Sequence, residues 1–264
     1  MTEPALDAAQ AAAARQFDQQ SQRYGRSHIL ADTTDIAAAL SGVKPAGGAR
    51  ALDVATGGGH TALWLARQGW SVTVGDVAPR MLAAAQALLA DAGFAAEARL
   101  FPAERMPFED ATFDVVASRV APHHFSSPAD FVQEAKRVLR PGGQFLLIDG
   151  SVPDDDPETA GWLHRVEKWR DSTHGRFLSR REWEELVRSA GLIIQQSELH
   201  PMQQPDPEWY FETAATPPAD RQHVREAVQS ASPHVRKAMQ LSEVDGKIGW
   251  RWQRLTLVAA RPQR

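Results

Sequence analysis

Short apolar runs alternate with helical patterns through the first part of the chain. These runs are rich in Val, Leu, Ile and Ala, and they cover residues 51–55, 71–76, 97–101, 113–118 and 144–149. Stretches between them repeat their apolar residues every three or four positions, as Phe131, Ala135 and Val138 do. Such runs predict buried strands and such repeats predict helices. The alternation therefore predicts a doubly wound α/β sheet.

Capping signals mark where two of the predicted helices begin. Ser127 is followed by Pro128, a pair typical of a helix N-terminus, and residues 140–143 end that helix with a Pro-Gly-Gly sequence. Ser179 and Glu182 have the spacing of a capping box at the start of a later helix. Both helices therefore have bounds that the sequence itself fixes.

The two ends of the chain depart from this alternation. Residues 3–22 are rich in Ala and Gln and predict a covering helix. The segment between the predicted strands 192–199 and 248–260 is too long for an ordinary connection and holds two helical patterns. We expect one domain over 1–264, made of an N-terminal helical flap (1–45), a ligand-binding core (46–150), a core continuation with a helical insertion (151–200), an inserted cap (201–246) and a final strand (247–264).

Composition and charge exclude several classes of protein. A net charge of −4 and a pI near 6.1 argue against a nucleic-acid partner, which would require a basic face. Cysteine is absent, which removes disulfides, thiolate nucleophiles and cysteine-based zinc sites. No run has the length of a membrane span, and the start lacks the apolar core of a signal peptide. The sequence therefore predicts a cytoplasmic protein without a membrane span.

The stretch 51–62 reads as a strand that turns through three glycines into a helix beginning near His60. Glycine permits positive φ and lets a ligand approach the backbone closely. The unpaired N–H groups at the start of a helix attract electron-rich ligand atoms. Residues 57–62 also fit the dinucleotide fingerprint G-x-G-x-x-[G/A], which is a weak signal by itself. The turn is therefore the predicted place of a nucleotide-like ligand.

Two acidic residues at strand ends narrow the choice of ligand. Asp53 precedes the glycines on the strand, where a carboxylate suits a positively charged ligand and would be poorly placed beside a pyrophosphate. Asp76 ends the second strand, close to the spacing at which an acidic residue accepts hydrogen bonds from ribose hydroxyls. Asp76 is equally suited to cap the next helix, which has Pro79 in its first turn, and the two roles are compatible.

Ordered motifs carry a family resemblance. The strand and turn read Asp-x-Ala-x-Gly-x-Gly from Asp53, residues 110–116 read DATFDVV, and residues 134–143 read EAKRVLRPGG. Over residues 17–149, this series resembles the class I S-adenosylmethionine-dependent methyltransferases, particularly the branch of ubiquinone and menaquinone C-methyltransferases and their small-molecule relatives. The motifs are specific as a set because they occur in the family's order.

The resemblance implies a Rossmann-like fold: a doubly wound, mostly parallel, seven-stranded sheet with a final antiparallel strand. It also implies S-adenosyl-L-methionine as cofactor and S-adenosyl-L-homocysteine as product. The expected reaction moves a methyl group to a small-molecule acceptor by in-line displacement, with C- or O-methylation favoured and N- or S-methylation as the alternative. Aligning the two partners supplies much of the catalysis in such a displacement.

The resemblance and the strand ends together assign the cofactor site. The expected cofactor-binding residues are Asp53, Ala55, Thr56, Gly57, Gly59, Asp76, Val77, Met81, Ala103, Glu104 and Arg119. The family usually has Asp-Ala-Glu after the third strand, with the Asp on the adenine amino group, whereas this chain has Pro102 before Ala103 and Glu104. The Ala103 N–H and Glu104 are therefore expected to recognise the adenine edge, or that contact is lost. Met81 is expected against the adenine face.

The loop after the fourth strand, residues 119–125, is where this fold usually holds the methyl acceptor. His124, with His123 as second choice, is the predicted catalytic base, because imidazole titrates near neutral pH and can accept an acceptor proton. Either histidine can instead hydrogen-bond the loop alone. A metal site is not expected, because adjacent strand-end residues point apart and no third ligand has matching spacing.

Aromatic residues concentrate in the predicted flap and cap. They favour an apolar acceptor pocket, although a single Trp can equally well pack the cap onto the sheet. The residues expected to bind the acceptor are Tyr24, His174, Trp209 and Tyr210.

Two other classes share the glycine turn. A NAD(P)-dependent oxidoreductase is disfavoured because neither tyrosine has a lysine four positions later: His28 follows Tyr24 and Ala214 follows Tyr210. A non-catalytic adenosylmethionine-binding protein would keep Asp53 without an acceptor pocket. The sequence leaves the acceptor and the oligomeric state open, a homodimer included.

Overall fold

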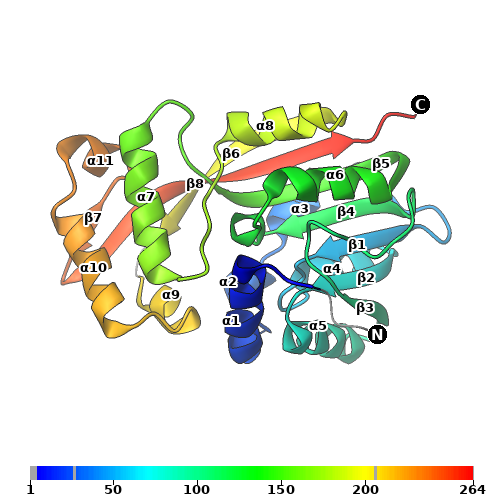
Figure 1. Cartoon of the computed structure of the whole chain (residues 1–264), viewed down its shortest axis with the longest axis horizontal. Helices are drawn as coiled ribbons and strands as arrows, with labels where there is room; N and C mark the ends of the chain where they lie inside the picture. Colours follow the sequence, from blue (N-terminus) through cyan, green and yellow to red (C-terminus); the bar gives the residue numbers. More distant parts are fainter. Residues whose placement is uncertain (1–4, 26–27, 205–206, 264) are drawn as a thin grey trace.

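One sheet forms the centre of the molecule (Figure 1). The computed structural model describes residues 5–25, 28–204 and 207–263, with side chains described outside residues 22–29. The strands in spatial order are β3 (Ala96–Leu100), β2 (Ser71–Asp76), β1 (Arg50–Val54), β4 (Phe113–Arg119), β5 (Leu139–Ser151), β8 (Lys247–Ala260) and β6 (Ile193–Gln204). The first five pair in parallel, and β8 lies antiparallel between β5 and β6.

The predicted seven-stranded, mostly parallel sheet with a final antiparallel strand is therefore confirmed. A further short strand, β7 (Ser242–Val244), pairs with the start of β8. The order of the strands reverses between β1 and β4, because the chain runs outward from β1 to β3 and then returns to the other side of β1. In open α/β sheets, ligands bind beyond the carboxyl ends of the strands at such a point.

Helices cover both faces of the sheet (Figure 1). One face carries α3 (Thr34–Ala39), α4 (His60–Arg67) and α5 (Pro79–Asp91), and the other carries α6 (Pro128–Val138) and α8 (Arg180–Ser189). Leu65 and Leu89 are buried against one face, while Phe131 and Trp183 are buried against the other. The predicted caps are present, since the Ser127 side chain accepts from Asp130 N–H and Ser179 forms the capping box with Glu182.

A second lobe extends from the far ends of β6 and β8. It contains α7 (Pro157–Arg170), α9 (Glu208–Thr213), α10 (Pro218–Gln229) and α11 (Pro233–Ala238). Its own apolar core includes Trp162, Phe211 and Trp250, and the Trp162 indole N–H donates to the Ala227 carbonyl at 3.0 Å. The helices of this lobe fall within the segments 151–200 and 201–246, to which the sequence assigns a helical insertion and a cap.

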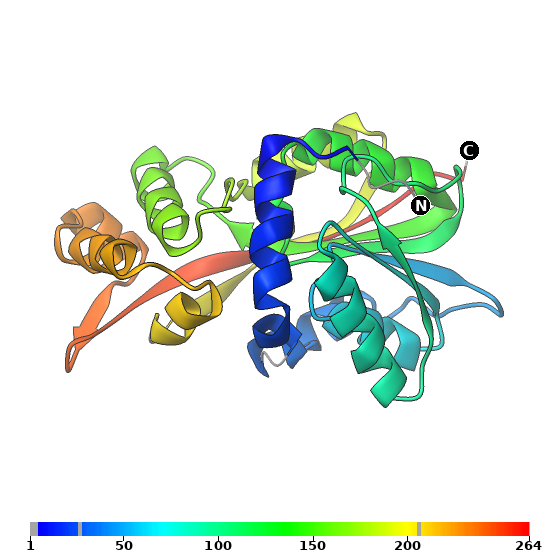
Figure 2. The same cartoon turned by 60° about the horizontal axis from the view of Figure 1, so that its bottom comes forward.

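The N-terminal helix α1 (Ala8–Gly25) crosses the gap between the sheet and the second lobe (Figure 2). Asp18 accepts a hydrogen bond from Arg80 N–H of α5 at 2.8 Å, and Gln20 donates to the Ala214 carbonyl of the second lobe at 3.0 Å. The short helix α2 (His28–Ala31) follows before α3. Helix α1 is therefore attached to both lobes beside the sheet's carboxyl edge.

The strand predicted over 192–199 is longer in the structure, where β6 reaches Gln204. Pro201 lies inside it, paired with Gln253 of β8. Proline cannot donate to a ladder hydrogen bond, so it reads as a strand breaker, but an edge strand tolerates it. β6 lies at the edge of the sheet and runs to Gln204, past residue 201 where the sequence places the start of the cap.

Candidate functional site

The turn after β1 takes the conformations that its small residues permit. Ala55 has φ of 55°, Gly57 of 51° and Gly59 of 84°, all in the left-handed region. The Thr56 N–H donates to the Gly75 carbonyl of β2 at 2.9 Å, which ties the turn to the neighbouring strand. A Cβ on Gly59 would lie 2.8 Å from the Ala85 Cα of α5, so only glycine fits there. Close packing of α4 on α5 thus requires the last glycine of the motif.

Replacing Ala55 by Gly is expected to raise the free energy of unfolding by about 1 kcal/mol. A left-handed conformation costs an alanine roughly 1–2 kcal/mol, and the greater conformational entropy of glycine in the unfolded chain offsets part of the gain from removing this strain. The melting temperature should then rise by about 2–4 °C. The matched control is Ala83→Gly on the exposed face of α5, which should lower stability instead. Equal thermal shifts for both variants would contradict the strain at Ala55.

Asp53 organises the turn from below. Its Oδ2 accepts from the Thr56 hydroxyl at 2.6 Å and from the Ala62 N–H of α4 at 3.1 Å. The side chain is 1% exposed, and burial raises the pKa of its carboxyl to about 7. Asp53 does not line the pocket described below. Its contacts hold Thr56 and the start of α4 in place. The carboxyl group itself lies beneath the turn and is not exposed in the pocket.

Asp76 lies at the pocket surface with unused acceptor capacity. Its Oδ2 accepts from Gly57 N–H and its Oδ1 from Ala78 N–H, both at 3.0 Å. An ionised carboxylate has about four lone-pair sites, so each oxygen can accept one further donor. Burial raises the pKa of Asp76 to about 6, although both N–H groups favour the charged form. Asp76 does not cap α5 as predicted, because Ala78 holds the N-cap position without a side-chain cap; Asp76 instead accepts from the Ala78 N–H just before the helix.

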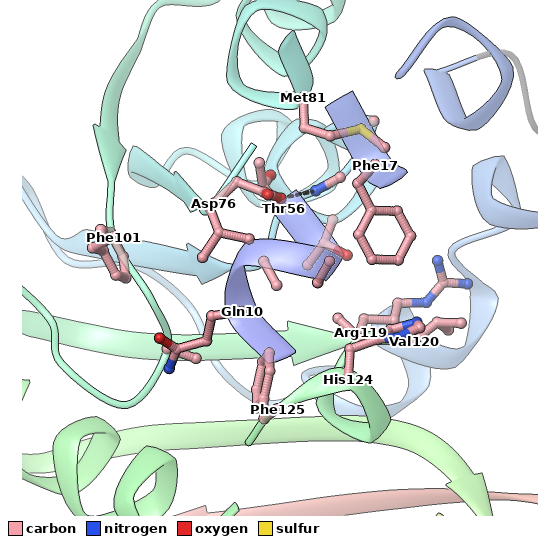
Figure 3. A pocket seen from close by; sticks show the side chains of 18 of the residues that line it. Gln10, Phe17, Thr56, Asp76, Met81, Phe101, Arg119, Val120, His124 and Phe125 are labelled. Carbon is pink, nitrogen blue, oxygen red and sulfur yellow. Dashed lines mark hydrogen bonds between the residues drawn. The ribbon is translucent and has the colours of Figure 1, made fainter. Parts of the chain in front are cut away.

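A pocket opens between the glycine turn, α1 and the loop after β4 (Figure 3). The lining residues are Gln10, Ala13, Phe17, Leu30, Ala55, Thr56, Gly57, Gly58, His60, Thr61, Asp76, Val77, Met81, Phe101, Ala103, Glu104, Arg119, Val120, Ala121, His124 and Phe125. Nine of the eleven expected cofactor-binding residues are among them, and Asp53 and Gly59 lie behind the surface.

The segment after β3 presents backbone to the pocket and uses its acid elsewhere. Both Glu104 oxygens are engaged by protein donors, Oε1 by the Ser126 N–H at 2.8 Å and Oε2 by the Gln10 amide of α1 at 2.8 Å. In the described part of the chain, the Ala103 N–H donates to no protein acceptor. Ala103 is therefore the freer of the two groups expected to meet the adenine edge, while Glu104 fastens α1 over the pocket.

Arg119 ends β4 and has most of its donors occupied. Its guanidinium pairs with Asp35 at 3.0 Å and donates to the carbonyls of Leu30 and Asp32. Arg119 thus holds the α2–α3 segment at the pocket wall. The next residue, Val120, has φ of 54°, an unusual conformation for a β-branched side chain. Strain of this kind clusters at functional sites, and here it turns Val120 into the pocket lining.

His123 and His124 form a short 3-10 helix, η1 (Pro122–His124), and face different surroundings. His123 is 6% exposed, and its Nδ1 lies 2.7 Å from Asp149 Oδ1 at the end of β5. His123 does not line the pocket. Asp149, near the carboxyl end of β5, is thus the partner of this histidine.

His124 lies on the pocket wall. Its Nδ1 is 3.1 Å from the Thr173 carbonyl, and its ring meets the Phe17 ring edge-on at 4.8 Å between centroids. Burial, aided by the neighbouring His123, lowers the pKa of His124 to about 3. The Thr173 hydroxyl also lies 3.3 Å from Nδ1, but it donates its proton to Asp171 Oδ1 at 2.7 Å. Since a carbonyl only accepts, this arrangement favours the proton on Nδ1 and an available lone pair on Nε2. The neutral ring is thus fixed in the tautomer of a proton acceptor.

A second, mostly apolar groove meets His124 and Phe125 from the other side. It runs between the first turns of α1, the start of α6 and the loop from α7 to α8, with Ala12 and Leu178 among its apolar residues. The cofactor pocket and this groove share only those two side chains. His124 therefore lies between the cofactor pocket and the second groove, which is lined by different residues.

The expected acceptor-binding residues lie in different parts of the structure. His174 is buried beside His123, with 5.2 Å between ring centroids, and it is among the residues that line the second groove. Trp209 and Tyr210 lie on α9, where Tyr210 packs under Arg170, and neither lines the pocket. The Tyr24 side chain lies outside the described residues. The sequence did not predict that Gln10 binds Glu104 or that other α1 residues line the pocket. Its one signal was the apolar side chain of Phe17 in the predicted flap.

The described part of the chain contains no group of three or more metal-ligating side chains close enough to hold an ion. In the same residues, no helix is long and apolar enough to cross a membrane.

Comparison with solved structures gives two close neighbours. A proposed methyltransferase from Bacillus halodurans C-125 is similar with a TM-score of 0.81 and 30% sequence identity, covering 87% of this chain and 99% of that one. The YcgJ protein from Bacillus subtilis has a TM-score of 0.79 at 24% identity, covering 90% and 100%. The second likeness concerns the fold alone.

Curated sequences agree. Residues 52–147 match a family described as a methyltransferase domain. The uncharacterized methyltransferase YcgJ of Bacillus subtilis (strain 168) is 29% identical over 68% of this chain and 71% of its own length. Demethylmenaquinone methyltransferase of Chlorobaculum tepidum is 38% identical over 39% of this chain and 41% of its own length. Several curated relatives thus match over less than half of their length.

This chain has the glycine turn, the acid at the end of β2 and the strand order expected of the family that the sequence motifs predict. Together with the near-complete match to the Bacillus halodurans structure, they show that this chain belongs to the class I S-adenosylmethionine-dependent methyltransferases.

Proposed function

We propose that this chain methylates a small molecule bound beside His124, with an oxygen or carbon acceptor favoured. The observation that carries the proposal is the contact of His124 Nδ1 with the Thr173 carbonyl, 3.1 Å long. It leaves Nε2 as the ring's proton acceptor at the wall between the two spaces. Oxygen and carbon acceptors require the removal of a proton, and a fixed neutral imidazole supplies a place for it.

The pocket residues fit the family's cofactor. Each oxygen of Asp76 has room for a ribose hydroxyl, and the Ala103 N–H remains as a donor for the adenine edge. The Asp53 carboxylate, one layer behind the turn, favours a positively charged ligand. When bound, S-adenosylmethionine would supply an electrophilic methyl carbon attached to a positively charged sulfur. The acceptor's electron pair would form the new bond to that carbon, and the electron pair of the broken carbon–sulfur bond would stay on sulfur.

His124 and the aromatic residues around it would do the remaining work. Nε2 takes the proton from an acceptor hydroxyl, or from a carbon acidified by a neighbouring carbonyl. Phe17 and Phe125 lie on either side of the histidine on the pocket wall, where they exclude water (Figure 3). The low pKa of His124 keeps the ring neutral at working pH but also makes it a weaker base than free imidazole. The nearby Asp171 carboxylate favours the protonated ring and would stabilise it as the proton arrives.

The groove on the far side of His124 is the proposed place of the acceptor. Its lining combines apolar side chains such as Ala12 and Leu178 with the charged side chains of Lys168, Arg176, Glu182 and Glu185. We therefore favour an acceptor that has both an apolar body and polar groups, such as a phenol or a quinone precursor. A nitrogen or sulfur acceptor is the alternative, because such nucleophiles attack with less need for a base. A cytoplasmic location and the absence of a nucleic-acid partner stay predictions from composition.

A screen with methyl-labelled S-adenosylmethionine tests the proposal. The purified protein is incubated with phenols, hydroxyquinones, amines and thiols, and labelled products are separated and counted. Transfer to a phenol or hydroxyquinone is the expected result. Adding NADH to the assay should not reduce this transfer. Binding of S-adenosylhomocysteine with no transfer to any acceptor class would instead support a non-catalytic adenosylmethionine-binding protein.

A further inference from the structure

The loop that holds His124 is held in turn by α1. Asp171 follows α7 and is 1% exposed, and its Oδ1 accepts from the Thr173 N–H at 2.8 Å and from the Thr173 hydroxyl at 2.7 Å. These bonds fix the turn whose Thr173 carbonyl faces His124. A bond from Gly175 N–H to the His123 carbonyl, 2.9 Å long, closes the turn against η1.

Gln16 of α1 grips this turn with both ends of its amide. Its nitrogen donates to Asp171 Oδ1 at 2.6 Å, and its oxygen accepts from the Ser172 hydroxyl at 3.1 Å. The next residue, Phe17, lines the cofactor pocket and touches the His124 ring. Helix α1 therefore reaches His124 by two routes, one through the Phe17 ring and one through the polar turn.

Asp171 makes the polar route strong. Burial opposes its ionisation, but the charge that His124 carries when protonated, the charge of Arg170 and the hydrogen bonds from Thr173 and Gln16 bring the pKa of Asp171 below its usual range. Hydrogen bonds to a charged acceptor are shorter and stronger than neutral ones. Since all of its described donors bind the same oxygen, loss of the Gln16 donor leaves a buried carboxylate with fewer partners.

The far side of the turn has an independent anchor. Lys168 of α7 donates to the Ser172 carbonyl at 2.7 Å and to the His174 carbonyl at 2.8 Å. Changing Gln16 therefore removes the link to α1 while the loop remains attached to the second lobe. The link to α1 can thus be cut without unfolding the site.

We infer that Gln16 is a positioning residue, which couples closure of α1 over the cofactor pocket to the proton-accepting tautomer of His124 through Asp171 and Thr173. With α1 closed, the Thr173 carbonyl holds the proton on Nδ1. With α1 open, the turn relaxes and both neutral tautomers become accessible. His124 is therefore held in its proton-accepting tautomer only when α1 encloses the cofactor. This inference rests on the proposed role of His124.

The test is nitrogen NMR of protein labelled at histidine, with S-adenosylhomocysteine at saturation and the His124 signals assigned by their loss in His124→Asn. In the wild type, Nδ1 is expected at the shift of a protonated nitrogen and Nε2 at that of an unprotonated one. Gln16→Ala should bring the two signals toward each other and weaken S-adenosylhomocysteine binding about tenfold in calorimetry. Gln16→Glu should do more, because it places a second carboxylate against Asp171.

Gln19→Ala is the matched control, because Gln19 is the same residue type on the exposed side of the same helix. It should change neither the shifts nor the affinity. Unchanged His124 shifts in both Gln16 variants, with S-adenosylhomocysteine still bound, would overturn the coupling alone. A wild-type protein that does not bind S-adenosylhomocysteine would instead overturn the proposed function. Averaged shifts already present in the saturated wild type would contradict the fixed tautomer.

Discussion

Replacing His124 by Ala is expected to lower the rate of methyl transfer to an oxygen or carbon acceptor by roughly 10²-fold or more, the usual contribution of a positioned general base. The cofactor pocket has Asp76 and the glycine turn on the opposite wall, so affinity for S-adenosylhomocysteine should change little. Rates come from labelled transfer to the best acceptor of the screen, and affinity comes from titration calorimetry. A loss in rate with cofactor affinity preserved is the signature of a base that serves the acceptor.

The pH profile separates a base from a merely orienting side chain. Because the pKa of His124 is lowered to about 3, the wild-type rate should show no titration of this ring above pH 5. The rate of His124→Ala should rise with pH as the acceptor ionises unaided. His200→Ala, on the exposed edge strand β6, is the matched control and should be fully active. A fully active His124→Ala enzyme would leave alignment alone as the source of catalysis.

Replacing Asp76 by Ala is expected to weaken S-adenosylhomocysteine binding by roughly 10²-fold, because two hydrogen bonds to a charged acceptor are lost at about 1.5–3 kcal/mol each. The same change leaves the Gly57 and Ala78 N–H groups without their acceptor, so Asp76→Asn is the gentler second variant and should lose less. Asp91→Ala, at the exposed end of α5, is the matched control. Wild-type affinity in Asp76→Ala would remove this residue from the site.

Cofactor affinity should also depend on pH through Asp76. Its pKa is raised to about 6 in the free protein, and hydroxyl donors of the ribose would favour its charged form. The ligand thus binds the ionised carboxylate better. Affinity should be constant above the raised pKa and fall as pH drops below about 6, and Asp76→Ala should show a weaker dependence. Calorimetry between pH 5 and 8 provides the comparison.

The sheet was predictable because its signals are local. Each strand of the first half is a short apolar run, and glycines or caps such as Ser127 mark the boundaries within a few residues. β6 was harder, since the tolerance for Pro201 depends on an edge position that only the assembled sheet defines. The same holds for β7, whose exposed residues carry no apolar pattern and pair only because β8 extends past the sheet.

The cofactor half of the site was predictable for the same reason, because the glycine turn and Asp76 are motif residues at strand ends. The acceptor half depends on contacts between segments far apart in sequence. Asp171 sits in an ordinary turn and Gln16 in an Ala-rich helix, and neither position has a pattern that indicates the other. The aromatic residues Trp209 and Tyr210, expected to bind the acceptor, contact each other and Tyr210 packs against Arg170 of the second lobe; neither lines the cofactor pocket.

A crystal structure of the protein with S-adenosylhomocysteine tests most directly the claim that the acceptor is methylated beside His124. The account predicts ribose hydroxyls within hydrogen-bonding distance of both Asp76 oxygens, the adenine edge at the Ala103 N–H, and the sulfur directed toward the space that His124 and Phe125 share with the apolar groove. A sulfur directed away from His124, with that histidine sealed off from the ligand by protein atoms, would contradict it.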